Sequence, residues 1–489
     1  MQGDDAFAGL EPAGLWKHFA AITRIPRPSG REGEVAAYVT AWAEGHGHPV
    51  EADARGNLCV HVPGRDGRGD APVVVLQSHL DMVCERDPGT PHDAERGDIR
   101  VVRDGEWLRA EGTTLGADNG IGVAAMLHAG EADLARGPLD LLFTVEEETG
   151  LHGAQALDPR IVRGRVLINL DNEEDGELCV GCAGSRGASV SMRGSPSPAG
   201  PGGSVLAVAV GGLLGGHSGM DIVKPRLNAI RALGRLLRAA SAAGDVRLVS
   251  IRGGGKRNAI PRDASAVLVV APTADAAVRE ALAREEAALR AQYGAAEPGM
   301  TIGVTSAGPQ EAAWSAADTR RLADLLVALP LGVQAMSPTV PGLVETSNSI
   351  GTLEMEGGEV RIGSLVRSSH APAADDVVNA IGSVARLAGA VAESTGGYPG
   401  WQPDPGSRVV EVARAAFERT IGTAPRITGV HAGLECGIIG DRIPGMDMVS
   451  FGPDIRGPHA PGERVHPGSV ARFWRLLSAV LDDLSSPQG

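Results

Sequence analysis

The sequence predicts an α/β protein whose central mixed sheet, flanked by helices, is interrupted by an inserted α+β domain. Short apolar runs alternate with helical segments in the first and last parts of the chain, as is typical of α/β folds. The 489 residues exceed a single ordinary core, and residues 187–398 form a stretch rich in Gly, Ala, Ser and Pro. We therefore expect one domain made of residues 1–186 and 399–489, with residues 187–398 inserted as a lid.

Charge and composition restrict the partners. The formal net charge of −15 argues against nucleic acid or an anionic membrane, because both bind cationic surfaces. The beginning of the chain has no signal-peptide pattern and no stretch has the length of a membrane span, so we expect a cytoplasmic protein. Five scattered cysteines favour reduced thiols, and the lone CxxC pair Cys179/Cys182 cannot complete a tetrahedral zinc site.

A histidine follows the first predicted buried strand. Residues 15–44 look helical around a Pro-rich break at 25–30, and residues 72–77 form a continuous apolar run, as in strands buried on both faces. This run ends in His79, with Asp81 two residues later. An aspartate so placed can reach the second imidazole nitrogen and fix the tautomer of a metal-binding histidine, although a lone HxD pattern is weak.

A glycine-rich loop at 113–122 leads into a helix around residues 123–127. Its glycines allow tight turns and close approach of the backbone. Asp118 lies at the helix entrance, where an N-capping role is the simpler interpretation.

The apolar run 139–145 ends in Glu146, Glu147 and Glu148, followed by a Thr-Gly turn. Three adjacent carboxylates repel one another, so they form either a solvated acidic loop or a site for a divalent metal with a general base beside it. Residues 165–170 and 446–452 are further strands, which lead to Asp171 and His459.

These segments share one geometry. In an open α/β sheet, ligand sites lie outside the carboxyl ends of the strands. We expect this edge to present a mixed set of histidines and carboxylates: His79, Asp118, Glu147 or Glu148, Asp171 and His459. Such a set suits two zinc-like ions bridged by an aspartate and roughly 3.5–4 Å apart.

The inserted domain has strand–helix units of its own. An irregular loop at 195–203 marks its start and residues 394–400 its end. We expect strands at 206–211, 265–270 and 359–367 and helices at 227–240, 276–293 and 317–329.

Taken together, the motifs resemble the metallopeptidase M20 family. The resemblance rests on these segments: His79-Leu-Asp81, the loop around Asp118, Glu147-Glu148-Thr-Gly, Asn169-Leu-Asp171 and Gly457-Pro-His459. Within the family, the following motifs are similar to the aminoacyl-histidine dipeptidase branch: Gly216-His217-Ser-Gly, Asn258-Ala-Ile-Pro261 and His431-Ala-Gly-Leu-Glu435-Cys-Gly437. The resemblance runs along nearly the whole chain and implies a zinc-peptidase-like catalytic domain.

The family's roles transfer by matching motif. The resemblance implies one metal held by His79, Asp118 and Asp171, and a second held by Asp118, Glu148 and His459. Asp81 would orient His79, and Glu147 would be the general base that takes a proton from the attacking water. Zinc is the expected metal, with cobalt or manganese as alternatives.

The same resemblance assigns roles in the lid. His217 would donate a hydrogen bond to the developing oxyanion, and Asn258 and Arg367 would bind the substrate's C-terminal carboxylate. Glu435 is a candidate contact for the substrate's α-amino group. The simpler interpretation of these residues is an ordinary surface role.

Glu146 has no assigned role. A shift of one residue in register would make Glu146 the base and Glu147 the ligand, and the Thr149-Gly150 turn favours the later pair.

The resemblance implies a cytoplasmic, homodimeric two-metal dipeptidase acting on unblocked L-dipeptides, Xaa-His dipeptides among them. One alternative is an amidohydrolase of the same superfamily that removes N-acyl groups from amino acids. Another is a non-catalytic metal-binding protein on the same fold.

Overall fold

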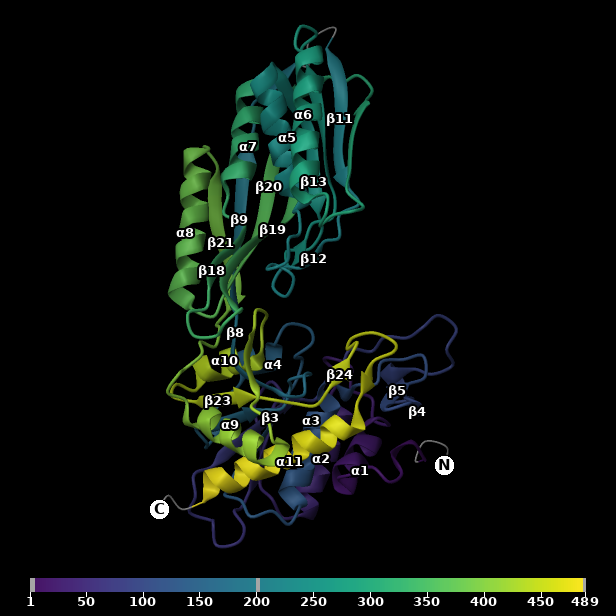
Figure 1. Cartoon of the computed structure of the whole chain (residues 1–489), viewed down its shortest axis with the longest axis vertical. Helices are drawn as coiled ribbons and strands as arrows, with labels where there is room; N and C mark the ends of the chain where they lie inside the picture. The colour runs from purple at the N-terminus through teal and green to yellow at the C-terminus, as the bar shows by residue number, and fades with distance from the viewer. Residues whose placement is uncertain (1–4, 199–202, 487–489) are drawn as a thin grey trace. The chain divides into compact units, whose positions relative to one another are not determined.

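The computed structural model describes residues 5–198 and 203–486 and confirms the α/β class. The chain divides into two compact units (Figure 1). Unit 1 comprises Met1–Gly181, Trp401–Gly429 and Leu434–Gly489, and unit 2 comprises Cys182–Gly400 and Val430–Gly433. Among the described residues, no helix combines the length and the apolar character needed to span a membrane.

The main sheet of unit 1 has eight strands in the order β1-β2-β6-β3-β7-β23-β8-β22. The four central strands β6, β3, β7 and β23 are parallel, and β1 and β2 extend the sheet in antiparallel fashion. Parallel central strands place their carboxyl ends on one edge. The bounds are β1 Val50–Ala52, β2 Leu58–Val62, β3 Val74–His79, β6 Leu139–Thr144, β7 Val166–Asn169, β8 Glu177–Cys182, β22 Arg426–Val430 and β23 Asp447–Ser450.

Helices pack against this sheet around an aliphatic core that includes Leu76, Ile121, Leu141 and Ile168. The central strands β3 and β6 are buried along their whole length, which explains their continuous apolar sequences. A smaller sheet has the order β24-β25-β5-β4. The remaining bounds are α1 Ala13–Ile22, α2 Gly33–Gly45, β4 Val101–Asp104, β5 Trp107–Ala110, α3 Ala117–Glu131, α4 His152–Ala156, α9 Arg408–Ile421, α10 Glu435–Arg442, β24 Ile455–Arg456, β25 Arg464–Val465 and α11 Pro467–Ser485.

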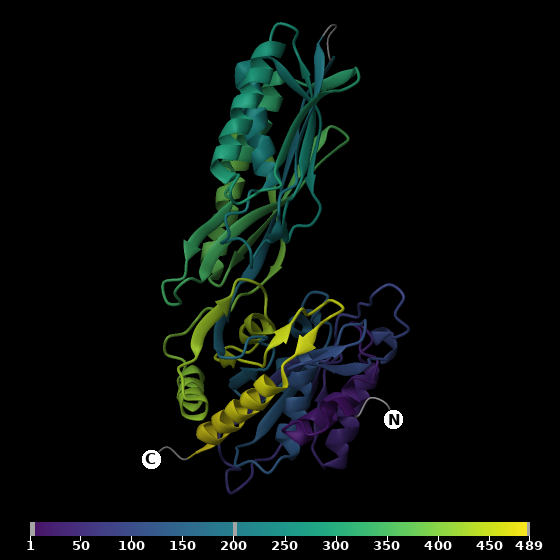
Figure 2. The same ribbon diagram turned by 45° about the vertical axis from the view of Figure 1, so that its right-hand side comes forward.

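Unit 2 is built on an antiparallel sheet of nine strands, with its helices against one face (Figure 2). The path runs β16-β11-β15-β13-β19-β20-β9-β21, and β18 pairs with β19. The sheet strands are β9 Gly184–Arg193, β11 Ser204–Gly211, β13 Val246–Gly254, β15 Ala264–Val270, β16 Thr301–Ser306, β18 Gly332–Met336, β19 Val344–Glu356, β20 Glu359–Ser368 and β21 Val391–Tyr398. The helices are α5 Ala229–Ala243, α6 Asp275–Tyr293, α7 Ala316–Ala328 and α8 Ala371–Leu387.

Two short strand pairs complete unit 2: β10 Pro196–Pro198 with β17 Ala312–Trp314, and β12 Gly216–His217 with β14 Ala259–Ile260. One expectation was wrong here. Residues 196–198 form β10, where an irregular loop was predicted. The partner strand β17 satisfies the backbone of this Pro-containing segment, which local sequence does not reveal. Residues 199–202 of the predicted loop lie outside the described residues.

Candidate metal centre and a second polar cluster

The carboxyl edge of the unit 1 sheet brings two histidines to one aspartate. His79 ends β3, and its Nε2 lies 3.1 Å from Asp118 Oδ1. The Nε2 atom of His459 lies 3.2 Å from the other oxygen, Oδ2, of Asp118. Asp118 therefore offers one carboxylate oxygen to each side of the cluster.

Each histidine also faces a second carboxylate. Asp171, just after β7, places Oδ1 3.4 Å from His79 Nε2. Glu148, in the loop after β6, places Oε2 2.9 Å from His459 Nε2. The structure thus brings both histidines and the carboxylates of Asp118, Asp171 and Glu148 together at this edge, and their division between two metal ions stays a prediction.

The donor set fits a divalent cation. One atom each from His79, Asp118 and Glu148 lie within 4.8 Å of one another. Burial, opposed by His79 and reinforced by Asp118 and Glu148, raises the pKa of Asp171 to about 6. Oε1 of Glu148 is buried without a hydrogen-bond partner among the described residues. Several buried carboxylates facing two imidazoles leave negative charge that a cation would offset.

Asp81 connects the first histidine to the glutamate loop. Its Oδ1 lies 3.3 Å from His79 Nδ1 and accepts the backbone N–H of Glu147, while Oδ2 accepts from Ser29 Oγ and the N–H of Glu148. Burial alone would raise the pKa of Asp81, but the contact with His79 and these hydrogen bonds hold it at about 2. Asp81 is therefore a fixed carboxylate that orients both His79 and the loop.

The glutamate triplet separates in space. Glu146 has a left-handed φ of 51° and forms an ion pair with Arg55, while its N–H donates to Glu32. Burial, together with the charges of Asp171 and Glu148, raises the pKa of Glu147 well above its ordinary value despite the opposing effect of His79. This geometry supports the register in which Glu147 and Glu148, and not Glu146, belong to the cluster.

Two positioning residues escaped the sequence analysis. Glu463 accepts the backbone N–H groups at the start of α3, from residues 115–118, at 2.7–3.2 Å. The buried Arg27 donates to the carbonyl oxygens of Leu80, Asp81 and Gly116. These two side chains fix the loops that carry Asp118 and His79, and their only sequence signal was proximity to the predicted motifs.

Glu435 begins α10 and lies in a buried polar network. Its Oε2 accepts from Gln77 Nε2 at 2.6 Å and from Thr144 Oγ1 at 2.7 Å. Gln77 Oε1 in turn accepts from Asn169, whose Oδ1 accepts from Ser450 Oγ. Burial raises the pKa of Glu435 to about 7, and its Oε1 has no hydrogen-bond partner among the described residues. The predicted contact with a substrate amine stays a prediction.

Unit 2 holds a separate cluster around His217. Its Nδ1 accepts the backbone N–H groups of Gly219 and Met220, which leaves the proton of the neutral ring on Nε2. Nε2 lies 3.2 Å from Nη2 of the buried Arg367, and burial followed by this guanidinium lowers the pKa of His217. Two donors therefore face each other, an arrangement that an anionic oxygen between them would relieve.

Other residues surround this pair. Arg367 also donates to Tyr398 Oη and Ser218 Oγ, and the carbonyl of Asn258 accepts from the N–H of Ser218. The Asn258 side chain is exposed. His431 is buried, and its Nε2 lies 2.7 Å from Ser347 Oγ. Ser347, Tyr398 and His431 had no role in the sequence analysis.

Comparison with known proteins decides the family. The model of peptidase family M20/M25/M40 matches residues 75–483. The chain belongs to this family. It is also 39% identical over 476 residues to the cytosol non-specific dipeptidase of Escherichia coli, covering 97% of this chain and 98% of that protein.

Two solved structures share the fold of this chain. The aminoacylhistidine dipeptidase of Vibrio alginolyticus is 37% identical, with a TM-score of 0.91 and 98% of each chain covered. An aminopeptidase from Bacillus cereus, at 17% identity and a TM-score of 0.58, shares the fold. The predicted family is thereby confirmed.

Proposed function

We propose that this chain is a cytoplasmic metallodipeptidase that hydrolyses unblocked L-dipeptides, Xaa-His dipeptides among them. The observation that carries the proposal is the near full-length similarity to two dipeptidases, at 39% and 37% identity. The clusters of units 1 and 2 would supply the chemistry that such a substrate requires. The name of the E. coli relative supports the cytoplasmic location.

The edge of the unit 1 sheet would hold two divalent ions, with zinc as the expected metal. His79, Asp118 and Asp171 would hold one, and Asp118, Glu148 and His459 the other. The observation that supports two ions is the position of Asp118, whose two oxygens each face a different histidine. When bound, such ions supply Lewis-acid polarisation of a carbonyl and increase the acidity of water.

Glu147 is the proposed general base. Its carboxyl is buried beside the cluster, and burial with neighbouring carboxylates raises its pKa, which makes it a better proton acceptor. Glu147 would take a proton from the attacking water and pass it to the leaving amine. Asp81 keeps Glu147 in place through the backbone and keeps the His79 ring oriented.

The unit 2 cluster is the proposed anion site. Arg367 and Asn258 would bind the dipeptide's C-terminal carboxylate, and the Nε2–H of His217 would donate to the oxyanion. The observation behind this is the donor-to-donor contact of His217 and Arg367 at 3.2 Å. Oε1 of Glu435 is the proposed partner of the substrate's α-amino group, since it is unpaired among the described residues.

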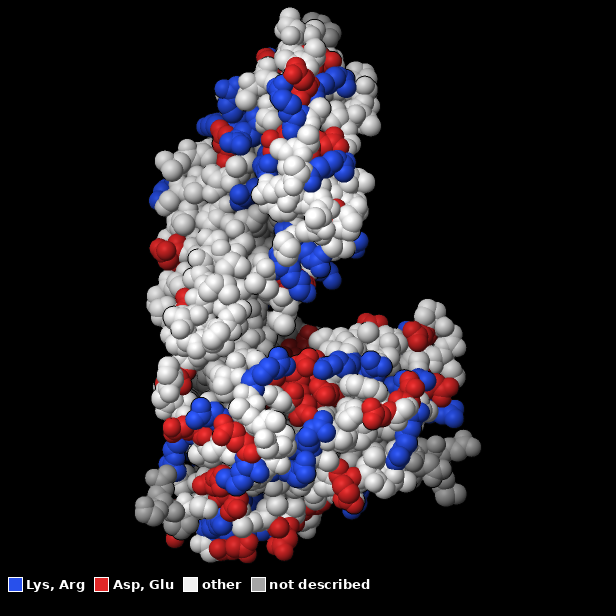
Figure 3. All heavy atoms as spheres, in the orientation of Figure 1, with Lys and Arg blue, Asp and Glu red and all other residues white. Residues whose placement is uncertain are grey.

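We further propose a homodimer formed through unit 2. Four exposed large apolar side chains lie on β18, α8 and β21: Val333, Met336, Leu387 and Val391. The surface over these elements shows few charged groups in Figure 3. β21 is also an edge strand of the sheet, and such strands can pair with a second copy.

The function is tested by a substrate panel with zinc-loaded protein. The panel contains free dipeptides with and without histidine, the same dipeptides with an N-acetyl or C-amide group, and N-acetyl amino acids. We expect turnover of the free dipeptides and a large loss with either block. Turnover of N-acetyl amino acids alone would replace the proposal by an amidohydrolase.

A further inference from the structure

A second group of metal-binding side chains lies in unit 1 away from the carboxyl edge. Cys59 and His61 are two residues apart on β2. Glu51 on β1 is paired with Cys59, and Asp140 on β6 is paired with His61. Residues two apart on a strand and residues directly paired across strands project from the same face. The register therefore places all four on one face of the sheet.

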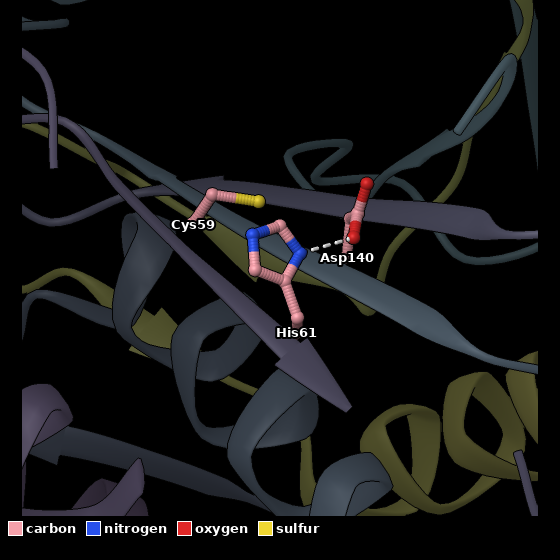
Figure 4. A group of neighbouring side chains, drawn as sticks. All are labelled: Cys59, His61 and Asp140. Atoms are coloured by element: carbon pink, nitrogen blue, oxygen red, sulfur yellow. Dashed lines mark hydrogen bonds and ion pairs between the residues drawn. The ribbon is translucent and has the colours of Figure 1, made fainter. Parts of the chain in front are cut away.

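Three side chains of this group are close enough to share an ion. One potential ligand atom each from Cys59, His61 and Asp140 lie within 4.8 Å of one another, and all three residues are buried. His61 Nε2 lies 3.1 Å from Glu51 Oε1. Figure 4 shows the Cys59 sulfur beside the ring nitrogen of His61 that does not face Asp140.

Both carboxylate oxygens of Asp140 already have hydrogen-bond partners, so this residue positions His61. Its Oδ1 lies 2.7 Å from His61 Nδ1, and its Oδ2 accepts the backbone N–H groups of Arg163 and Gly164 at 2.6 and 3.0 Å. Asp140 thus fixes the Nδ1 side of the His61 ring, and Nε2, which faces Glu51, is the ring nitrogen that a metal would bind. This is the carboxylate–histidine arrangement found behind many metal-bound imidazoles.

Glu51 is the member of the group that solvent reaches. Its side chain is 43% exposed and is shared between His61 and Arg163, whose own side chain is 54% exposed. Arg163 can return to water when a cation takes its place beside Glu51. The site therefore has a buried sulfur and nitrogen at its base and an accessible carboxylate at its entrance.

We propose that Cys59 Sγ, His61 Nε2 and a Glu51 oxygen bind a zinc-type divalent ion, with water as the fourth ligand. Thiolate, imidazole and carboxylate are the ligands that zinc takes in tetrahedral sites. The ion links β1 to β2, and through the His61–Asp140 pair it reinforces the link to β6. It is separate from the proposed catalytic pair, because Asp140 lies near the start of β6 whereas Glu147 and Glu148 follow its end.

Metal binding at this site releases the thiol proton of Cys59. Burial, reinforced by Asp140 and Glu51, raises the pKa of the Cys59 thiol well above its usual range, so the thiol is protonated before the ion enters. The thiol proton passes to solvent as the metal–sulfur bond forms, and occupancy rises with pH. This inference is independent of the proposed substrate.

Cobalt titration of the metal-free full-length protein tests the site, because a cobalt–thiolate bond gives a charge-transfer absorption that imidazole and carboxylate ligands do not. The proposed catalytic ligands include no sulfur. We expect the wild type and the control Cys84→Ser to bind three cobalt ions per chain, one of which gives the thiolate band. In Cys59→Ala the band disappears and the total cobalt content falls by one, while dipeptide turnover is retained.

Two results would overturn the proposal. One is a wild-type protein with saturated cobalt content and no thiolate band. The other is a band that persists in Cys59→Ala. The wild-type spectrum alone decides the first case, so the test does not depend on the folding of the variant.

Discussion

The two clusters predicted from sequence motifs have opposite electrostatic character. In unit 1, buried carboxylates surround His79 and His459, and burial raises the pKa values of Asp171 and Glu147. In unit 2, His217 and Arg367 face each other as two donors. The excess of carboxylates in the first cluster favours a cation, and the two facing donors of the second favour an anion.

Charge imbalance, more than any single motif, distinguishes a ligand site from an ordinary polar network. The hydrogen bonds that join Gln77, Asn169 and Ser450 link neutral groups, and the charge of this network resides in Glu435, to which Gln77 donates. Removing a charged side chain from an imbalanced cluster should therefore weaken binding of its ligand and lower the activity. The following variants measure this difference.

The largest effect is expected for Asp118→Ala. Asp118 offers an oxygen to each histidine, so its loss should release both ions and lower kcat/KM by about 10⁴-fold or more, beyond what a general base alone contributes. Elemental analysis and dipeptide hydrolysis measure both effects. A variant that keeps its metal and its activity would remove Asp118 from the bridging position.

Glu147→Gln should separate catalysis from metal binding. Loss of the general base is expected to lower kcat by roughly 10²–10⁴-fold with metal content near that of the wild type. Glu146→Gln is the matched control, because Glu146 pairs with Arg55 instead of facing the cluster. If Glu147→Gln turned over substrate as fast as the wild type, or if Glu146→Gln lost more activity, the roles would move by one residue. Glu146 would then be the base and Glu147 the ligand.

Arg367→Ala tests the anion site of unit 2. Charge-assisted hydrogen bonds contribute about 1.5–3 kcal/mol, so kcat/KM for free dipeptides should fall roughly 10- to 150-fold. Dipeptide amides should be affected much less. Arg361→Ala on the same strand is the control, since its side chain is half-exposed and pairs with Glu359. Equal losses for free acids and amides would argue against carboxylate binding.

The smallest effect concerns stability in unit 2. Burial, then the charge of Arg367, lowers the pKa of His431 to about 4 from 6.5. The unfolded chain therefore binds more protons between these values, and His431 contributes stability above pH 6.5 that is lost as pH falls toward 4. Between pH 7.5 and 5 the contribution should fall by roughly 2 kcal/mol.

Urea unfolding of wild type and His431→Gln at both pH values measures this contribution. The wild type should lose more free energy of unfolding than the variant on acidification. An identical pH dependence of the two proteins would show that His431 titrates alike in the folded and unfolded states.

Local sequence was enough to predict the α/β class and the main strands. The apolar runs before His79, Glu146 and Asp171 correspond to β3, β6 and β7, because strands buried on both faces require continuous apolar sequence. Parallel strands then bring their following residues to one edge. The grouping of the proposed ligands could therefore be inferred, although their roles remain proposals.

Contacts between distant parts of the chain could not be predicted. Glu463 binds backbone amides about 350 residues earlier, and Arg27 joins two loops by donating to carbonyl oxygens. Backbone groups are present at every position, so no side-chain pattern marks these partners. Strand pairing likewise unites Cys59, His61 and Asp140, whose spacing alone suggested nothing.

The most direct test of the central claim is a zinc titration of the metal-free Cys59→Ala protein, in which the carboxyl edge of unit 1 is the proposed binding site. Hydrolysis of a free dipeptide is followed as zinc is added. We expect no turnover without zinc and a plateau at two ions per chain. Full turnover of the metal-free protein, or a plateau reached with a single ion, would contradict it.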